Sequence, residues 1–161
     1  MTTDLTALQI ITRLVFAAAA GALVGIDREA RGKPAGFRTH ALVALGAALV
    51  SVCSIQYLST QGADPAAVTR VIQGIVAGVG FLGGGVILHA RDRDAITGIT
   101  TAATIWIVAA LGIACGGGHW IPATAAVLLV EIILIFGRRV DSLLHTRMKE
   151  PSEALWVSKS S

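Results

Sequence analysis

The stretch Gly25-Ile-Asp-Arg-Glu-Ala-Arg-Gly-Lys-Pro-Ala-Gly-Phe-Arg-Thr-His40 separates two long apolar runs, Leu5–Ile26 and Ala41–Leu58. A helix needs about 20 mostly apolar residues to cross the hydrocarbon core of a bilayer, and both runs are close to that length. The stretch between them carries six charged side chains and is too polar to enter the bilayer. It is therefore predicted to lie at a membrane surface, where it joins two membrane-spanning helices.

Three further segments are long and apolar enough to be spans, namely Val71–Leu88, Ile99–Cys115 and Ile121–Gly137. The chain is 54% hydrophobic and only 14% charged, whereas soluble domains average about 25% charged residues. We predict an all-α fold, a polytopic membrane bundle of about five transmembrane helices. Residues 1–137 are expected to form this transmembrane domain, and residues 138–161 a short cytoplasmic tail with no soluble C-terminal domain.

The distribution of basic residues predicts the orientation of the bundle. Lys and Arg accumulate in short cytoplasmic loops of membrane proteins. All but two of the 13 Lys and Arg residues, Arg13 and Arg70, fall on the same side of the five spans. The N-terminus is thus expected outside and the C-terminus in the cytoplasm. The same asymmetry accounts for the sequence pI of about 9.3 without a nucleic-acid partner.

The charged strip after the first span is the first candidate functional site, because charges kept at a membrane boundary are costly unless they are paired. Asp27 adjoins the last apolar residue, so we expect it to be the most buried acid of the strip. Three interpretations stay open: a salt-bridged lid, a site for anionic lipid headgroups, or a Mg²⁺ site, because Mg²⁺ takes oxygen ligands. The strip consists of Asp27, Arg28, Glu29, Arg31, Lys33 and Arg38, and the candidate metal ligands are Asp27, Glu29 and Asp92.

Glu131 is an isolated acid in the middle of the fifth apolar segment. A carboxylate at that depth costs about 2.5–3.5 kcal/mol on insertion scales. It is expected to face the bundle, either protonated or paired with a base, or to act in a proton or cation relay.

Glycines recur at helical spacing within the spans, at Gly21/Gly25 and Gly112/Gly116 and most densely in the third span. Small residues four apart let helix backbones approach closely in lipid. The third span is interpreted either as a tightly packed central helix or as a broken helix that lines an ion or substrate path. The packing candidates there are Gly74, Gly78, Gly80, Gly83 and Gly84.

Four sequence blocks together resemble the MgtC/SapB family of bacterial inner-membrane proteins. They are Gly25–His40, the block Leu42-Val-Ala-Leu-Gly-Ala47, the glycine-rich block Gly78–Ile87, and Gly98-Ile-Thr-Thr-Ala-Ala-Thr-Ile-Trp106. The resemblance implies a multi-pass α-helical protein of the inner membrane, associated with Mg²⁺ limitation and ion homeostasis as a regulator of other membrane proteins. Members linked to virulence have Asn and Cys at the positions of Thr100 and Ile107, so the resemblance does not imply a virulence role here.

Two functions are therefore expected as alternatives. The first is a non-enzymatic regulator that binds partner membrane proteins or itself through glycine-lined faces, because the sequence has many close-packing motifs and no catalytic grouping. The second is a small cation or proton transporter working as a homo-oligomer, with Glu131 in the span and Asp27 at its inner mouth. Membrane lipids and inner-membrane proteins are the expected partners, and no cofactor is expected apart from possible binding of Mg²⁺.

Overall fold

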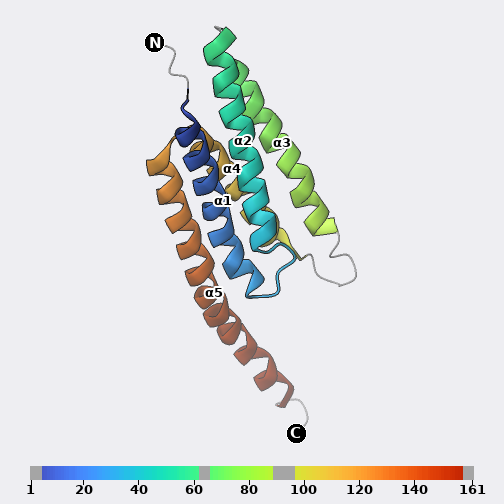
Figure 1. The fold of residues 1–161 in the computed structure, drawn as a ribbon. Coiled ribbons are helices and arrows are strands. Elements are labelled where there is room, and N and C mark those ends of the chain that lie inside the picture. Colours follow the sequence, from blue (N-terminus) through green and yellow to red (C-terminus); the bar gives the residue numbers. More distant parts are fainter. Residues whose placement is uncertain (1–4, 62–65, 89–96, 158–161) are drawn as a thin grey trace. The chain divides into compact units, whose positions relative to one another are not determined.

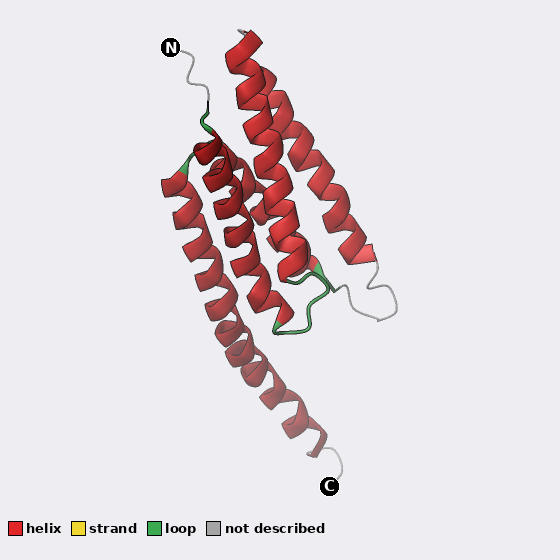
Figure 2. Ribbon diagram, viewed as in Figure 1, coloured by secondary structure: helices red, strands yellow, loops and turns green. Residues whose placement is uncertain are grey.

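A computed structural model describes residues 5–61, 66–88 and 97–157, and these residues form helices and connecting loops with no strand (Figure 2). The helices are α1 (Ala7–Glu29), α2 (Phe37–Gln61), α3 (Ala66–Leu88), α4 (Ile99–Gly116) and α5 (Trp120–Val157). Each contains a segment long and apolar enough to span a membrane. The all-α prediction and the five candidate spans are confirmed for this part of the chain. The side on which each terminus lies stays a prediction.

Local signals fix where two of the helices begin. Thr6 forms a capping box with Gln9: the Gln9 amide donates to the Thr6 hydroxyl at 3.3 Å, and the Thr6 amide donates to the Gln9 side chain at 3.0 Å. These bonds satisfy amides that have no partner within the helix. Helix α4 begins after Gly98, whose φ of 88° is a conformation that other residues adopt only with strain.

Helix α1 packs against α2 at backbone distance through Gly21 and Gly25. A Cβ atom built on Gly21 would lie 2.8 Å from the Cβ of Ala44, and one built on Gly25 would lie 2.8 Å from the carbonyl oxygen of Gly36. Real Cβ atoms do not approach other atoms so closely, so any larger residue at either position would force α1 away from α2.

Helix α4 packs against α2 in the same way. A Cβ atom on Gly112 would lie 2.8 Å from the Cβ of Ala47, and one on Gly116 would lie 2.6 Å from the carbonyl oxygen of Ala48. Close packing of small residues is the main source of helix association in lipid, where helices gain nothing by leaving an apolar solvent. The face of α2 that carries these alanines is therefore the packing surface for both α1 and α4.

The contacts between helices determine which side chains are buried inside the bundle (Figure 1). Helix α2 contacts α1, α3 and α4, and α4 contacts α1, α2 and α3. The buried side chains at these contacts are mostly small. One cluster consists of Ala17, Ala48, Cys115 and Ala123, and another of Ala35, Ala47, Val79, Ile105 and Ala109.

The glycine-rich helix α3 is not the central helix. Only 11% of its apolar segment is buried, against 50% for α4. A Cβ on Gly83 would touch Ala102 at 3.4 Å, but none would meet an atom within 4 Å at the other four packing candidates, Gly74, Gly78, Gly80 and Gly84. The interpretation of α3 as a tightly packed central helix is wrong, because α1 and α4 supply the glycines that α2 packs against. Helix α3 is also continuous rather than broken.

By its internal contacts the chain divides into two compact units, Met1–Val127 and Leu128–Ser161. The first unit holds α1 to α4 and the beginning of α5. The second holds the remainder of α5, which continues as a helix beyond the apolar segment ending at Gly137 as far as Val157.

We predict that Gly112→Ala destabilises the bundle, because the new methyl group would have to displace the α2 backbone. Overpacking of this kind costs about 1–3 kcal/mol. The matched control is Gly85→Ala in α3, where the methyl group meets nothing within 4 Å and the helix gains up to about 1 kcal/mol of propensity. Unfolding in mixed detergent micelles measures both, and equal stabilities would contradict the packing described here.

Candidate functional site

The charged strip divides into side chains with different surroundings. Arg28 is buried, with only 5% of its surface exposed. Asp27 and Arg31 are partly buried, at 17% and 18% side-chain exposure. Glu29, Lys33 and Arg38 are exposed. As expected, Asp27 is more buried than Glu29. The strip is therefore not a single cluster, and Arg28 is the member that enters the bundle.

Arg28 connects α1 to α4. Its Nη2 group donates a hydrogen bond of 2.8 Å to the hydroxyl of Thr101, 73 residues away in the sequence. Its Nε group has no hydrogen-bond partner, and no described carboxylate pairs with it. The guanidinium is therefore held by uncharged groups, which makes its hydrogen bond to Thr101 costly to lose.

His40 connects α2 to the same part of α4 and is completely buried. Its Nδ1 atom lies 2.8 Å from the carbonyl oxygen of Gly36, which only accepts, so Nδ1 carries a proton. Its Nε2 atom lies 3.0 Å from the hydroxyl of Thr104. Because a buried charge without a carboxylate partner is costly, we infer a neutral ring whose unprotonated Nε2 faces the Thr104 hydroxyl.

The Thr104 hydroxyl has a second acceptor within reach, the carbonyl oxygen of Thr101 at 2.8 Å. A hydroxyl has one proton, so it donates either to His40 or to this carbonyl. Arg28, His40, Thr101 and Thr104 form what we call the buried polar network, which ties α1, α2 and α4 together. His40, Thr101 and Thr104 were not predicted as site residues, although two threonines three residues apart in an apolar helix share one face.

Asp27 and Arg31 form an ion pair at the end of α1. The Arg31 Nε group also donates to the backbone carbonyl of Asp27 at 3.0 Å. One carboxylate oxygen of Asp27, Oδ2, is buried without a hydrogen-bond partner. Asp27 is thus compensated in charge but not fully satisfied in hydrogen bonding.

Glu29 caps the next helix. Its Oε2 atom accepts a hydrogen bond of 2.9 Å from the backbone amide of Phe37, the first residue of α2. A carboxylate at a helix N-terminus also interacts favourably with the helix dipole. Glu29 therefore has a local structural role at the turn between α1 and α2.

The described residues contain no group of three or more His, Cys, Asp or Glu side chains placed to hold a metal ion. Of the three candidate ligands, Asp27 pairs with Arg31 and Glu29 caps α2. Asp92 lies outside the described residues. A Mg²⁺ site at this strip stays a prediction.

Two other charged residues lie in apolar segments. Arg13 on α1 donates from Nη1 to the carbonyl oxygen of Gly116 at 2.7 Å and so caps the C-terminal end of α4. Glu131 is partly buried on α5, and its Oε1 atom has no hydrogen-bond partner.

The glycines of α3 at which an added Cβ would meet no other atom lie on two different faces of the helix. A helix turns by roughly 100° per residue, so Gly74 and Gly78 share one face, whereas Gly80 and Gly84 share another. Gly83 lies on the side that contacts Ala102 of α4. Helix α3 thus has two separate glycine faces that no part of the described chain fills.

Comparisons with known proteins agree with one another. The family model described as the MgtC family matches residues 14–143. Protein SrpB of Synechococcus elongatus is 37% identical over 155 residues, covering 92% of this chain and 85% of SrpB. YhiD of Escherichia coli K12, named provisionally as a magnesium transporter, is 42% identical over 144 residues, covering 85% of this chain and 65% of YhiD.

Protein MgtC of Salmonella typhimurium LT2 is 41% identical over 120 residues, which is 74% of this chain but only 48% of that protein. No solved structure matches the chain.

We predict that Thr101→Val destabilises the protein by roughly 1.5–3 kcal/mol, the range for a hydrogen bond to a charged group. Valine keeps the shape of threonine but leaves the buried guanidinium of Arg28 without its acceptor. Thr100→Val, at an exposed neighbouring position, is the control. In an Arg28→Met background the Thr101→Val change should cost almost nothing, because the interaction is already lost. The same cost in both backgrounds, measured by unfolding in detergent, would exclude the coupling.

Proposed function

The chain belongs to the MgtC family, and we propose on this premise that it is a non-enzymatic regulator in the bacterial inner membrane. It acts in ion homeostasis, Mg²⁺ homeostasis in particular, by binding other membrane proteins or a second copy of itself. Its N-terminus lies outside and its C-terminus in the cytoplasm. The name of the relative YhiD supports the link to magnesium but leaves the role itself open.

The observation that carries this proposal is the uncovered face of Gly80 and Gly84. The pairs Gly21/Gly25 and Gly112/Gly116 have the same spacing, and each packs a helix against α2. At Gly80 and Gly84 the backbone is equally open to close approach, but no atom within 4 Å would meet a Cβ there. Each such glycine weakens α3 by roughly 1 kcal/mol relative to alanine. A helix from a partner would offset this cost through close packing.

The buried polar groups support the same function. Arg28, His40, Thr101 and Thr104 form hydrogen bonds that link helices, as expected for groups that hold a bundle in one conformation. A regulator that binds through an outer face requires a rigid bundle behind that face.

We predict that a photo-reactive residue at Ala77, exposed and on the same side of α3 as Gly80 and Gly84, crosslinks the protein to a partner or to itself in native membranes. Gly80→Leu and Gly84→Leu should abolish the crosslinked band, because the larger side chains prevent backbone approach. Gly85→Leu, on a different side of α3, should leave it intact. A protein that stays strictly monomeric in membranes and in mild detergent would overturn the proposal.

The alternative function is a small cation or proton transporter working as a homo-oligomer. It is favoured by two carboxylate oxygens without hydrogen-bond partners, Oδ2 of Asp27 and Oε1 of Glu131. In this alternative Glu131 carries the ion or proton within the span, and Asp27 lies at the inner mouth.

Flux of Mg²⁺, K⁺ and H⁺ into liposomes containing the purified protein distinguishes the two functions. The transporter alternative predicts flux that Glu131→Gln abolishes and that Glu29→Gln, a change at an exposed helix cap, leaves in place. The regulator proposal predicts no flux above that of empty liposomes. Flux that depends on Glu131 would therefore refute it.

A further inference from the structure

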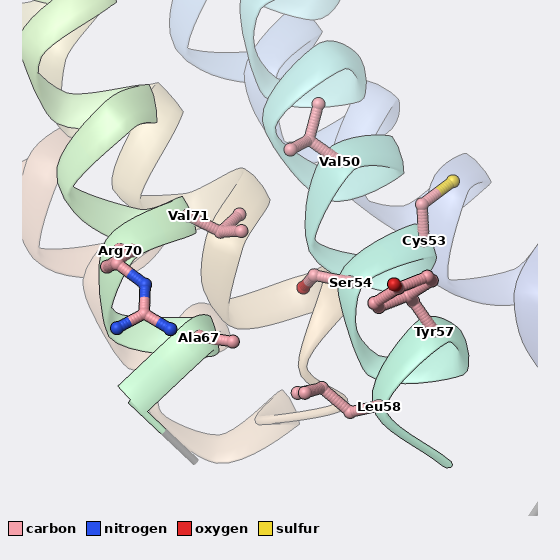
Figure 3. A pocket seen from close by; sticks show the side chains of 8 residues that line it. All are labelled: Val50, Cys53, Ser54, Tyr57, Leu58, Ala67, Arg70 and Val71. Carbon is pink, nitrogen blue, oxygen red and sulfur yellow. The ribbon is translucent and has the colours of Figure 1, made fainter. Parts of the chain in front are cut away.

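An open apolar hollow lies between the ends of α2 and α3 that are remote from the charged strip (Figure 3). Its volume is about 660 Å³. In Figure 3, Ser54 and Leu58 reach from α2 towards α3, and Val71 faces them from α3. Tyr57 and Arg70 also line it, from α2 and α3 respectively, and Val50 lies nearer the middle of α2.

A second hollow of about 350 Å³ continues along the same two helices and shares Val50 with the first. It extends to Leu42 on α2 and Leu82 on α3. From Leu42 to Leu58 the helix rises by about 24 Å, which is most of the roughly 30 Å thickness of a hydrocarbon core. We call the two hollows together the α2–α3 groove.

Glycine keeps the groove open. Gly46 of α2 and Gly74 and Gly78 of α3 line its second part. A Cβ atom at any of the three would meet nothing within 4 Å, so close packing within the chain does not explain the glycines. A larger side chain at these positions would occupy the groove instead.

An exposed cation lies at the mouth of the groove. Arg70 is exposed, lies in the second turn of α3, and makes no hydrogen bond or ion pair with a described residue. Tyr57, which lines the hollow from α2, is 64% exposed. Tyrosine is typical of the membrane–water interface, so the mouth lies at headgroup level, in the outer leaflet according to the predicted topology.

We propose that the α2–α3 groove binds one acyl chain of an anionic glycerophospholipid, with the lipid phosphate on Arg70. The guanidinium matches a phosphate in charge and can donate two parallel hydrogen bonds to it. The acyl chain lies along the apolar walls and over the three glycines.

A protein helix fits the groove less well. A helix is about 10 Å across with its side chains, so 24 Å of it fills roughly 1,900 Å³. The two hollows hold about 660 and 350 Å³. The groove is separate from the uncovered face proposed to bind a partner protein. Gly80 and Gly84, which form that face, lie on a different side of α3 from Gly74 and Gly78.

Native mass spectrometry of the purified protein tests the proposal, with delipidated protein given either phosphatidylglycerol or phosphatidylcholine. One phosphatidylglycerol per chain should be retained, with phosphatidylcholine retained about tenfold less. Arg70→Gln should weaken phosphatidylglycerol retention about tenfold, as for the loss of a charged hydrogen bond. Arg139→Gln, on α5 outside the charged strip, removes one exposed charge and should have no effect.

The variant Gly74→Leu fills the groove and should abolish retention, whereas Gly80→Leu should not. A melting temperature for each variant confirms folding, and Arg70→Gln tests the site even if Gly74→Leu does not fold. Equal retention of the two lipids, loss of lipid only in Arg139→Gln, or a protein dimer that Gly74→Leu disrupts would each overturn the proposal.

Discussion

Helices α1 and α4 both meet α2 at distances that leave no room for a side chain, and the remaining geometry depends on these two contacts. Lipid is as apolar as the helix surfaces, so burial alone gives the helices little reason to associate. Close contact between backbones must supply the attraction. Gly21 and Gly25 provide it on α1, and Gly112 and Gly116 provide it on α4, against a face of α2 composed of alanine and serine. Helix α3 lacks such contacts at most of its glycines and is correspondingly exposed.

Close packing also determines how a charge can be buried at the end of α1. Because α1 and α4 approach each other closely, Arg28 reaches Thr101, and His40 reaches Thr104 from α2. A buried arginine held only by neutral groups is tolerated where the surrounding structure fixes its position. The network lies among α1, α2 and α4, so a lipid or protein can bind to the outer faces of α3 without breaking a hydrogen bond of the network.

Much of this architecture was predictable from the sequence, and the residues show why the rest was not. The spans follow from the lengths of the apolar runs, and the charged strip marks the turn between α1 and α2. Which glycines pack within the chain depends on what faces them. Gly112 and Gly80 are each followed by another glycine four residues later, but only Gly112 meets the small residues of α2. Arg28 lies in the last turn of α1 and is buried, whereas Lys33 lies in the turn that follows and is exposed, and a strip of charges does not reveal this difference. His40 ends one of the blocks that carry the family resemblance, but its contact with Thr104 could not be predicted, because Thr104 lies 64 residues further along the chain.

Both arginines of α1 donate a hydrogen bond to the same later helix. Arg13 donates to the carbonyl of Gly116 and Arg28 to the hydroxyl of Thr101, at sequence separations of 103 and 73 residues. During synthesis, α1 therefore enters the membrane long before either acceptor exists. Until α4 inserts, each guanidinium has to be held by water or lipid headgroups. Insertion of α4 then supplies both acceptors together, the Gly116 carbonyl for Arg13 and the Thr101 hydroxyl for Arg28.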